Sequence, residues 1–207
     1  MAGIGADIKE VLEELGEPII VYKLDGSIIY GEFCDPEAYY EHSTEFIRQN
    51  CYAGTFAYDT TVTYGDIVSF NDLFFLMLNV KPTTFEREKV DNLAFFVQCN
   101  VSGRFARFVS GVRNSKQEKT GAWVTIGPDE VKGLQVESGG GVENTAQEST
   151  ILNNDSEDLY CQAHSLIKVG YRWYPDSEDD SEFYEVAHIQ KRRYQNCYRI
   201  RLKEDKR

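Results

Sequence analysis

The sequence lacks the features that mark several large classes of protein. It has only 3 histidines and 2 methionines, and its 5 cysteines are odd in number and include no CxxC pair. This usage argues against a disulfide framework and indicates a reducing compartment. The longest apolar run, LFFLMLNV, has the length of a strand and not of a membrane span. The opening MAGIGADIKE has no apolar core segment, so we expect no signal peptide.

Sequence motifs for catalysis and for metal binding are missing as well. The chain contains no Walker A, GxGxxG, GxSxG or HExxH pattern. His42, His164 and His188 are isolated, and none has a cysteine nearby at zinc spacing. The acidic turn at 176–182 lacks the central glycine of an EF-hand loop. We therefore expect a protein that is not an enzyme, with no catalytic residue, cofactor or metal. A β-barrel hydrolase that assembles a Cys–His pair in space is the enzymatic alternative.

Aromatic residues that favour strands are abundant. The 207 residues include 13 Tyr and 12 Phe, and 42% are hydrophobic, which is enough for a packed core. The length fits one or two domains. The composition predicts a mainly β fold, built from small antiparallel β-barrel or sandwich modules.

One pattern occurs twice along the chain. From Gly65 the sequence reads GDIVSF, ND, LFFLMLNVKP and, after a charged turn, LAFFVQCN. From Gly170 it reads GYRWYP, DSEDDSE, FYEVAHIQ and, after a second charged turn, CYRIRLKED. Each copy has the order of a three-stranded antiparallel meander. Two related β-modules are one interpretation, and two unrelated sets of hairpins are the other.

These patterns divide the chain into four predicted regions. They are an N-terminal helix (1–16), a first β-barrel module (17–110), a flexible middle segment with short strands (111–160) and a C-terminal β-meander or second module (161–207). Asp25–Gly26, between two apolar runs, predicts a hairpin turn in the first module. The basic stretch 102–122 interleaves arginine with phenylalanine, and we interpret it as a solvated linker because its surroundings are acidic.

The N-terminal segment predicts an amphipathic helix that ends at Gly16, because Pro18 cannot continue it. Its apolar face is a candidate partner interface and comprises Ile4, Ile8, Val11, Leu12 and Leu15. Such a helix either covers its own barrel or docks on a neighbouring subunit.

Charge is distributed unevenly over a chain whose net charge is −12. Residues 1–50 carry 11 acidic and 3 basic side chains (−8), whereas residues 151–207 carry 11 acidic and 10 basic ones (−1). The densest basic cluster, at a predicted turn, is Lys191, Arg192 and Arg193, followed by Tyr194. We predict that it is a second partner interface. Ends of opposite charge steer head-to-tail contacts, which close into rings when the rotation permits. The alternative is a solvated strand edge.

Three stretches together resemble the neck proteins of tailed bacteriophages, a class of head–tail connector, head-closure and tail-completion proteins. They are MAGIGADIKEVLEELG with the hairpin that follows, GDIVSFNDLFFLMLNVKP, and FYEVAHIQKRRYQNCYRIRLKED, so the resemblance covers residues 1–33, 62–100 and 168–205. The glycine-rich middle and the length of the chain depart from the family pattern.

The resemblance implies a structural virion protein at the head–tail interface, assembled in the host cytoplasm. It would link the portal or adaptor ring to the tail and help to conduct or retain the packaged DNA. Its implied partners are copies of itself in a homo-oligomeric ring, the portal or adaptor protein and tail proteins. Double-stranded DNA would pass through the lumen without sequence-specific binding, and no membrane is involved. An acidic protein suits this role because phosphate contacts need Lys and Arg. A capsid decoration or tail-fibre β-domain that acts as a binding module is the alternative.

Overall fold

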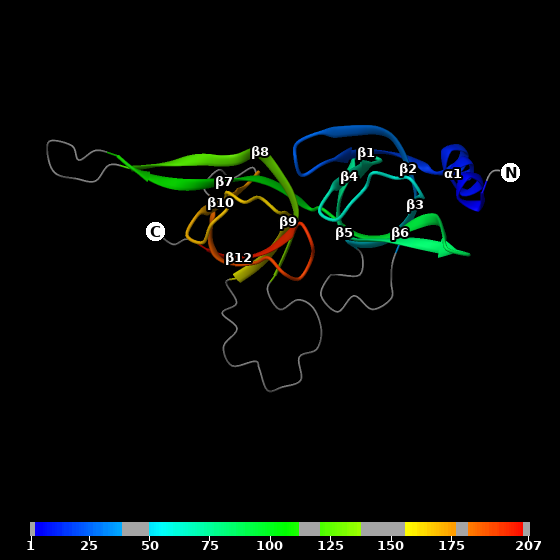
Figure 1. Cartoon of the computed structure of the whole chain (residues 1–207). Helices are drawn as coiled ribbons and strands as arrows, with labels where there is room; N and C mark the ends of the chain where they lie inside the picture. The colour runs from blue at the N-terminus through cyan, green and yellow to red at the C-terminus, as the bar shows by residue number, and fades with distance from the viewer. Residues whose placement is uncertain (1–2, 39–49, 112–120, 138–155, 177–181, 205–207) are drawn as a thin grey trace, which may run out of the picture.

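The chain forms an N-terminal helix followed by two closed antiparallel β-barrels of six strands each (Figure 1). The computed structural model describes residues 3–38, 50–111, 121–137, 156–176 and 182–204. The helix, the first barrel and the second barrel follow one another along the long axis, with the two termini near opposite ends (Figure 1). The predicted mainly β fold is therefore confirmed.

Helix α1 spans Ile4–Leu15, as the apolar spacing predicted. It ends where the N–H of Gly16 donates to the carbonyl of Leu12 at 2.9 Å, and the chain then enters the first strand. Pro18, which has no N–H, belongs to that strand.

The first barrel comprises β1 (Glu17–Tyr22), β2 (Ile28–Ala38), β3 (Cys51–Ala57), β4 (Ile67–Phe70), β5 (Leu73–Phe85) and β6 (Glu88–Gln98). The strands pair in the cyclic order β1-β2-β3-β6-β5-β4. The Asp25–Gly26 hairpin turn is confirmed between β1 and β2, with Gly26 at φ 86°. Buried aromatic rings fill the interior; Phe75 and Phe96, for example, meet edge to face at 5.5 Å.

The second barrel comprises β7 (Val101–Ser110), β8 (Gly121–Glu137), β9 (Ser156–Gln162), β10 (Arg172–Pro175), β11 (Tyr184–Gln190) and β12 (Cys197–Glu204). The strands pair in the cyclic order β10-β11-β12-β9-β8-β7. Phe105 and Trp173 pack in its core with ring centroids 4.7 Å apart. The outer parts of β7 and β8 remain paired and extend beyond the barrel as an arm (Figure 1).

The second barrel begins earlier than the predicted region boundaries. Its first two strands come from stretches interpreted as a linker and as the flexible middle segment. The basic stretch nevertheless forms β7, in which Phe105 is buried in the barrel core while Arg104 and Arg107 are exposed. The three glycines at 139–141 and the tip of the acidic turn at 177–181 lie outside the described residues.

The two barrels share one topology. In each, the first strand pairs with the second and the fourth, and the third pairs with the sixth. The two predicted meanders occupy equivalent places, as strands four to six of their barrels. Gly65 and Gly170 precede these strands with φ of 82° and 84°. Gly65 donates its N–H to the carbonyl of Met77, and Gly170 donates its N–H to the carbonyl of the equivalent Val186, each at 2.8 Å.

The irregularities of the strands also recur. The register shifts between Met77 and Asn79 in β5, and in the same way between Val186 and His188 in β11. Leu78 of the first barrel is therefore equivalent to Ala187 of the second. A turn and a bulge that recur at matching positions allow the outer surfaces of the barrels to be compared residue by residue.

Candidate functional site

The junction between the barrels is the main apolar surface outside the two barrel cores. The outward side chains of β5 and β6 in the first barrel, among them Leu76, Leu78 and Val97, pack with Leu134 and Tyr160 of the second. Leu76 and Val97 are fully buried although they point away from the interior of their own barrel. The barrels are thus joined by a continuous apolar core.

Polar contacts supplement this junction. Gln162 donates to the carbonyl of Tyr22 at 3.2 Å, and Asn196 donates to the carbonyl of Tyr64 at 3.2 Å. The ammonium of Lys132 lies 3.8 Å from the centroid of the Phe74 ring. Because only Cys99 and Asn100 separate β6 from β7, the barrels have little freedom to reorient.

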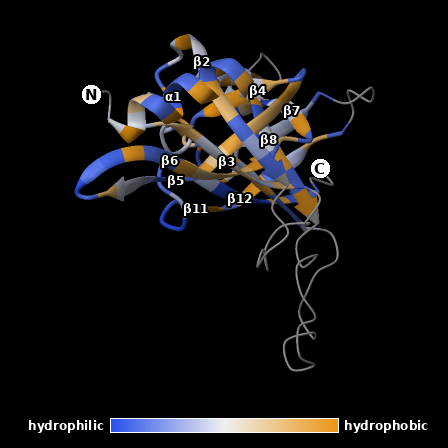
Figure 2. Ribbon diagram, turned by 90° about the vertical axis from the view of Figure 1, so that its right-hand side faces the viewer, coloured by the Kyte–Doolittle hydropathy of each residue, from blue (hydrophilic) through white to orange (hydrophobic). Residues whose placement is uncertain are grey.

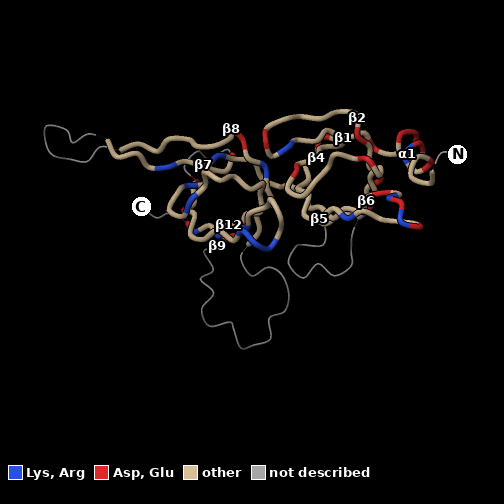
Figure 3. Tube along the Cα trace, viewed as in Figure 1, with Lys and Arg blue, Asp and Glu red and all other residues tan. Residues whose placement is uncertain are grey.

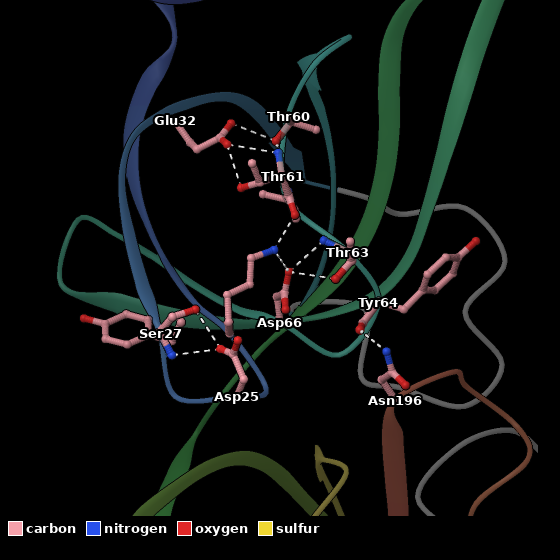
Figure 4. Close-up of polar contacts among 12 residues, drawn as sticks. Asp25, Ser27, Glu32, Thr60, Thr61, Thr63, Tyr64, Asp66 and Asn196 are labelled. Atoms are coloured by element: carbon pink, nitrogen blue, oxygen red, sulfur yellow. Dashed lines mark hydrogen bonds and ion pairs between the residues drawn. The ribbon is translucent and has the colours of Figure 1, made fainter.

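A polar cluster, which we call the clamp, fixes the loop that reaches the junction (Figure 4). The buried carboxylate of Asp66 accepts bonds from the Lys23 ammonium at 2.7 Å, the Thr63 N–H at 2.7 Å and the Thr63 hydroxyl at 3.0 Å. Lys23 also donates to the carbonyl of Thr61. These bonds hold Tyr64 in place against Asn196 of the second barrel.

A second carboxylate completes the clamp. Glu32 on β2 accepts from the Thr60 hydroxyl at 2.8 Å and from the hydroxyl and N–H of Thr61 at 2.8 and 3.0 Å. Both carboxylates of the clamp are engaged in internal hydrogen bonds. The cluster therefore orders the loop and supports the junction between the barrels.

Asp66→Ala should lower the free energy of unfolding by about 2 kcal/mol, because it leaves the Lys23 ammonium and the Thr63 donors without their acceptor. Urea denaturation of the two proteins measures the difference. The matched control is Asp25→Ala, which removes an exposed carboxylate bonded only within its own turn to Ser27. A loss as large in the control as in Asp66→Ala would contradict a special role for the clamp.

The structure divides the predicted interface of α1 between two environments (Figure 2). Leu12 is buried against the first barrel and Ile8 is half-buried, so the helix covers its own barrel. Ile4, Val11 and Leu15 are 49%, 54% and 81% exposed. The helix therefore packs intramolecularly and also leaves an apolar stripe on the outside, which suits the second of the two predicted roles.

The predicted basic cluster lies in the turn between β11 and β12, far from α1. Lys191, Arg192 and Arg193 are exposed there, whereas Tyr194 packs into the apolar junction between the barrels. The aromatic residue of this cluster thus contributes to the fold of its own chain. The structure does not bring the cluster and the helix together within one molecule.

The arm carries an apolar surface that sequence reasoning missed. Phe108, Val109 and Val124 are each more than 40% exposed. Beside it, the guanidinium of Arg172 lies between the rings of Trp123 and Phe183, 4.1 Å from each centroid. The short apolar runs FV in β7 and AWV in β8 were the available signal, but the basic residues around them favoured the interpretation as a linker.

The cysteines are reduced and mostly buried. Burial raises the pKa of Cys99 and of Cys197 to about 12, and it raises the pKa of Cys34 and of Cys161 still further. A thiol with so high a pKa forms almost no thiolate near neutral pH, and thiolate is the reactive species.

We therefore expect Ellman's reagent, at about pH 8, to leave the native thiols unmodified while it titrates all five thiols of the urea-unfolded chain. Absorbance at the thionitrobenzoate band gives the count directly. Rapid release of one equivalent from the native chain would show an accessible, activated thiol and would contradict this expectation.

The described residues carry few features that indicate chemistry. Within them, no three His, Cys, Asp or Glu side chains are grouped so that they could hold a metal ion. In the same residues, no helix has the length and apolar character needed to cross a membrane. No protein-family model matches the sequence, and no curated protein matches it significantly.

Proposed function

We propose that this chain is a structural subunit of a tailed-phage neck, which assembles as a ring between the portal or adaptor and the tail. The observation that carries the proposal is the fusion of two like barrels into one elongated body through an apolar junction. An apolar stripe, on α1, remains exposed at one end of this body. An elongated body with an apolar end suits a building block of a larger assembly.

The packed interiors of the two barrels determine where DNA would pass in such a ring. The interior of each barrel is occupied by its own core, including Phe75 and Phe96 in the first and Phe105 and Trp173 in the second. The DNA channel of this proposal is therefore the opening enclosed by the ring of subunits. The net charge of −12 suits the wall of such a channel, because it repels phosphate and so does not retain the DNA.

The location of the protein in the particle tests the proposal. Antibodies raised against the purified chain should label the head–tail junction in immunogold electron microscopy of particles of the phage that encodes it. Label over the capsid shell or at the fibre tips would favour the alternative, a decoration or tail-fibre module. Particles without label would contradict a virion protein altogether.

A further inference from the structure

The turn by which the first barrel contacts the second, at Gly65, has a counterpart in the second barrel, and the space beside that counterpart is open. At the junction, a Cβ on Gly65 would lie 2.4 Å from the backbone oxygen of Asn196. Gly170, the equivalent residue of the second barrel, has nearly the same φ, yet a Cβ there would meet nothing within 4 Å. Gly170 thus presents the conformation of a docking turn, and no residue described in the chain fills the space beside it.

The residues around this open turn form an exposed apolar surface. Leu166 and Val169 are 58% and 59% exposed. Val169 immediately precedes Gly170, as Tyr64 precedes Gly65 at the junction. The exposed Lys168 lies beside them. Two exposed large apolar side chains next to an open turn indicate a contact surface and not a solvated loop.

The sheet beside the open turn is equivalent to the sheet of the first barrel that packs at the junction, but its chemistry differs. In register, Phe95 and Val97 on β6 are equivalent to Arg201 and Lys203 on β12. Two junction positions that are apolar in the first barrel are therefore basic in the second, whereas Leu76 is equivalent to Glu185. A face with Arg201 and Lys203 in place of apolar residues fits an acidic partner surface. A contact made by this face would be more polar than the junction between the two barrels.

The opposite end of the molecule offers a surface of that kind. Within the chain, the Gly65 turn is received by Asn196, just before β12. The equivalent place in the first barrel is the turn between β5 and β6, where Phe85 is 53% exposed. Glu86, Arg87, Glu88 and Lys89 are exposed there, so this turn carries both signs of charge. Helix α1 packs beside it on β6.

At this end of the molecule acidic residues gather on α1, and basic residues lie with acidic ones at the β5–β6 turn (Figure 3). The exposed carboxylates of α1 are those of Asp7, Glu10, Glu13 and Glu14. They surround the exposed apolar stripe of the helix described above. This end of the molecule therefore offers exposed apolar side chains to the open turn and the carboxylates of α1 to Arg201 and Lys203.

We propose that the chain binds a second copy of itself head to tail, in repetition of the contact between its own barrels. The Gly170 turn and the β10–β12 sheet of one copy dock on the β5–β6 turn and α1 of the next. This inference rests on the proposed function as an assembling subunit and specifies its contact. A heterologous contact of this kind generates a ring when the rotation closes and a filament when it does not.

Sedimentation velocity of the full chain, over a series of concentrations at low and high salt, tests the contact. The tail variant Lys168→Glu/Lys203→Glu and the head variant Glu10→Lys/Glu14→Lys should each weaken self-association at least about tenfold at low salt, because like charges then meet. An equimolar mixture of the two should associate again. In that mixture the acidic tail meets the basic head, and the unchanged ends meet each other.

The matched control is Lys191→Glu/Arg192→Glu, which makes the same charge change at exposed residues of the β11–β12 turn. This turn was predicted from the sequence to be an interface, and the contact proposed here does not use it. It should associate like the wild type. Wild-type chain that stays monomeric throughout, a tail variant that associates normally, or a mixture that fails to recover would each overturn the proposal. Far-UV circular dichroism establishes that every variant is folded. These outcomes leave the immunogold result unaffected, so a failure of the contact is distinguishable from a failure of the proposed function.

Discussion

Replacing Leu78 with aspartate should lower the free energy of unfolding by about 5 kcal/mol or more. Leu78 is 1% exposed within the apolar junction, although it points out of its own barrel. The substitution removes a buried leucine and places a carboxylate where no partner is available, and both effects destabilise. Urea denaturation followed by circular dichroism measures the loss, and separate transitions for the two barrels would appear if the junction opens first.

The repeat supplies an internal control for this experiment. Ala187→Asp makes the same kind of change at the equivalent position of the second barrel, which is half-buried beside charged residues of the outer sheet. Its effect should stay below about 1 kcal/mol, as for most substitutions away from a core. Equal losses at the two positions would contradict the view that the junction, and not the bulge, makes Leu78 important.

Replacing Gly65 with alanine should lower the free energy of unfolding by about 3–4 kcal/mol. The left-handed φ of 82° contributes about 1–2 kcal/mol for a residue with a Cβ. The remainder arises because the methyl group would lie 2.4 Å from the backbone oxygen of Asn196. Backbone cannot move aside as a flexible side chain can, so the junction must shift. Thermal and urea unfolding report the loss.

Gly170→Ala separates the two contributions. The φ at Gly170 is 84° and the space around it is open. Gly170→Ala should therefore lower the free energy of unfolding only by the conformational strain of the left-handed φ, about 1–2 kcal/mol. A loss at Gly170 as large as that at Gly65 would mean that the turn alone matters, and the close approach of the barrels at Asn196 would be refuted.

Local patterns in the sequence predicted much of the fold. The helix Ile4–Leu15, the Asp25–Gly26 turn and the three strands of each meander follow from signals within a few neighbouring residues, whereas the equivalence of the two meanders was one of two interpretations. These signals work because period, turn chemistry and strand propensity act locally. The stretch that forms β7 was interpreted as a linker because of its arginines, and β8, which is one strand of 17 residues, was predicted only as short strands within a flexible segment.

The sequence also contains a signal of the junction between the barrels, which is clear only when β5 is compared with the equivalent strand β11. The run FFLML of β5 is continuously apolar, whereas the equivalent FYEVA of β11 has Glu185 in place of Leu76. A continuous run indicates a strand that is covered on both faces. The partner that covers the outer face could not be identified in this way, because Leu134 and Tyr160 are distant along the chain.

The apolar outer face of the first barrel also has a consequence for synthesis of the chain. All six strands of that barrel lie before residue 99, so it is complete when about half of the polypeptide has been made. Leu76, Leu78 and Val97 then face solvent until the second barrel follows. At ordinary elongation rates this interval is roughly 5–20 s. During translation the nascent chain therefore presents a hydrophobic sheet that only its own unfinished half can cover, and chaperones that bind such surfaces would act in this interval.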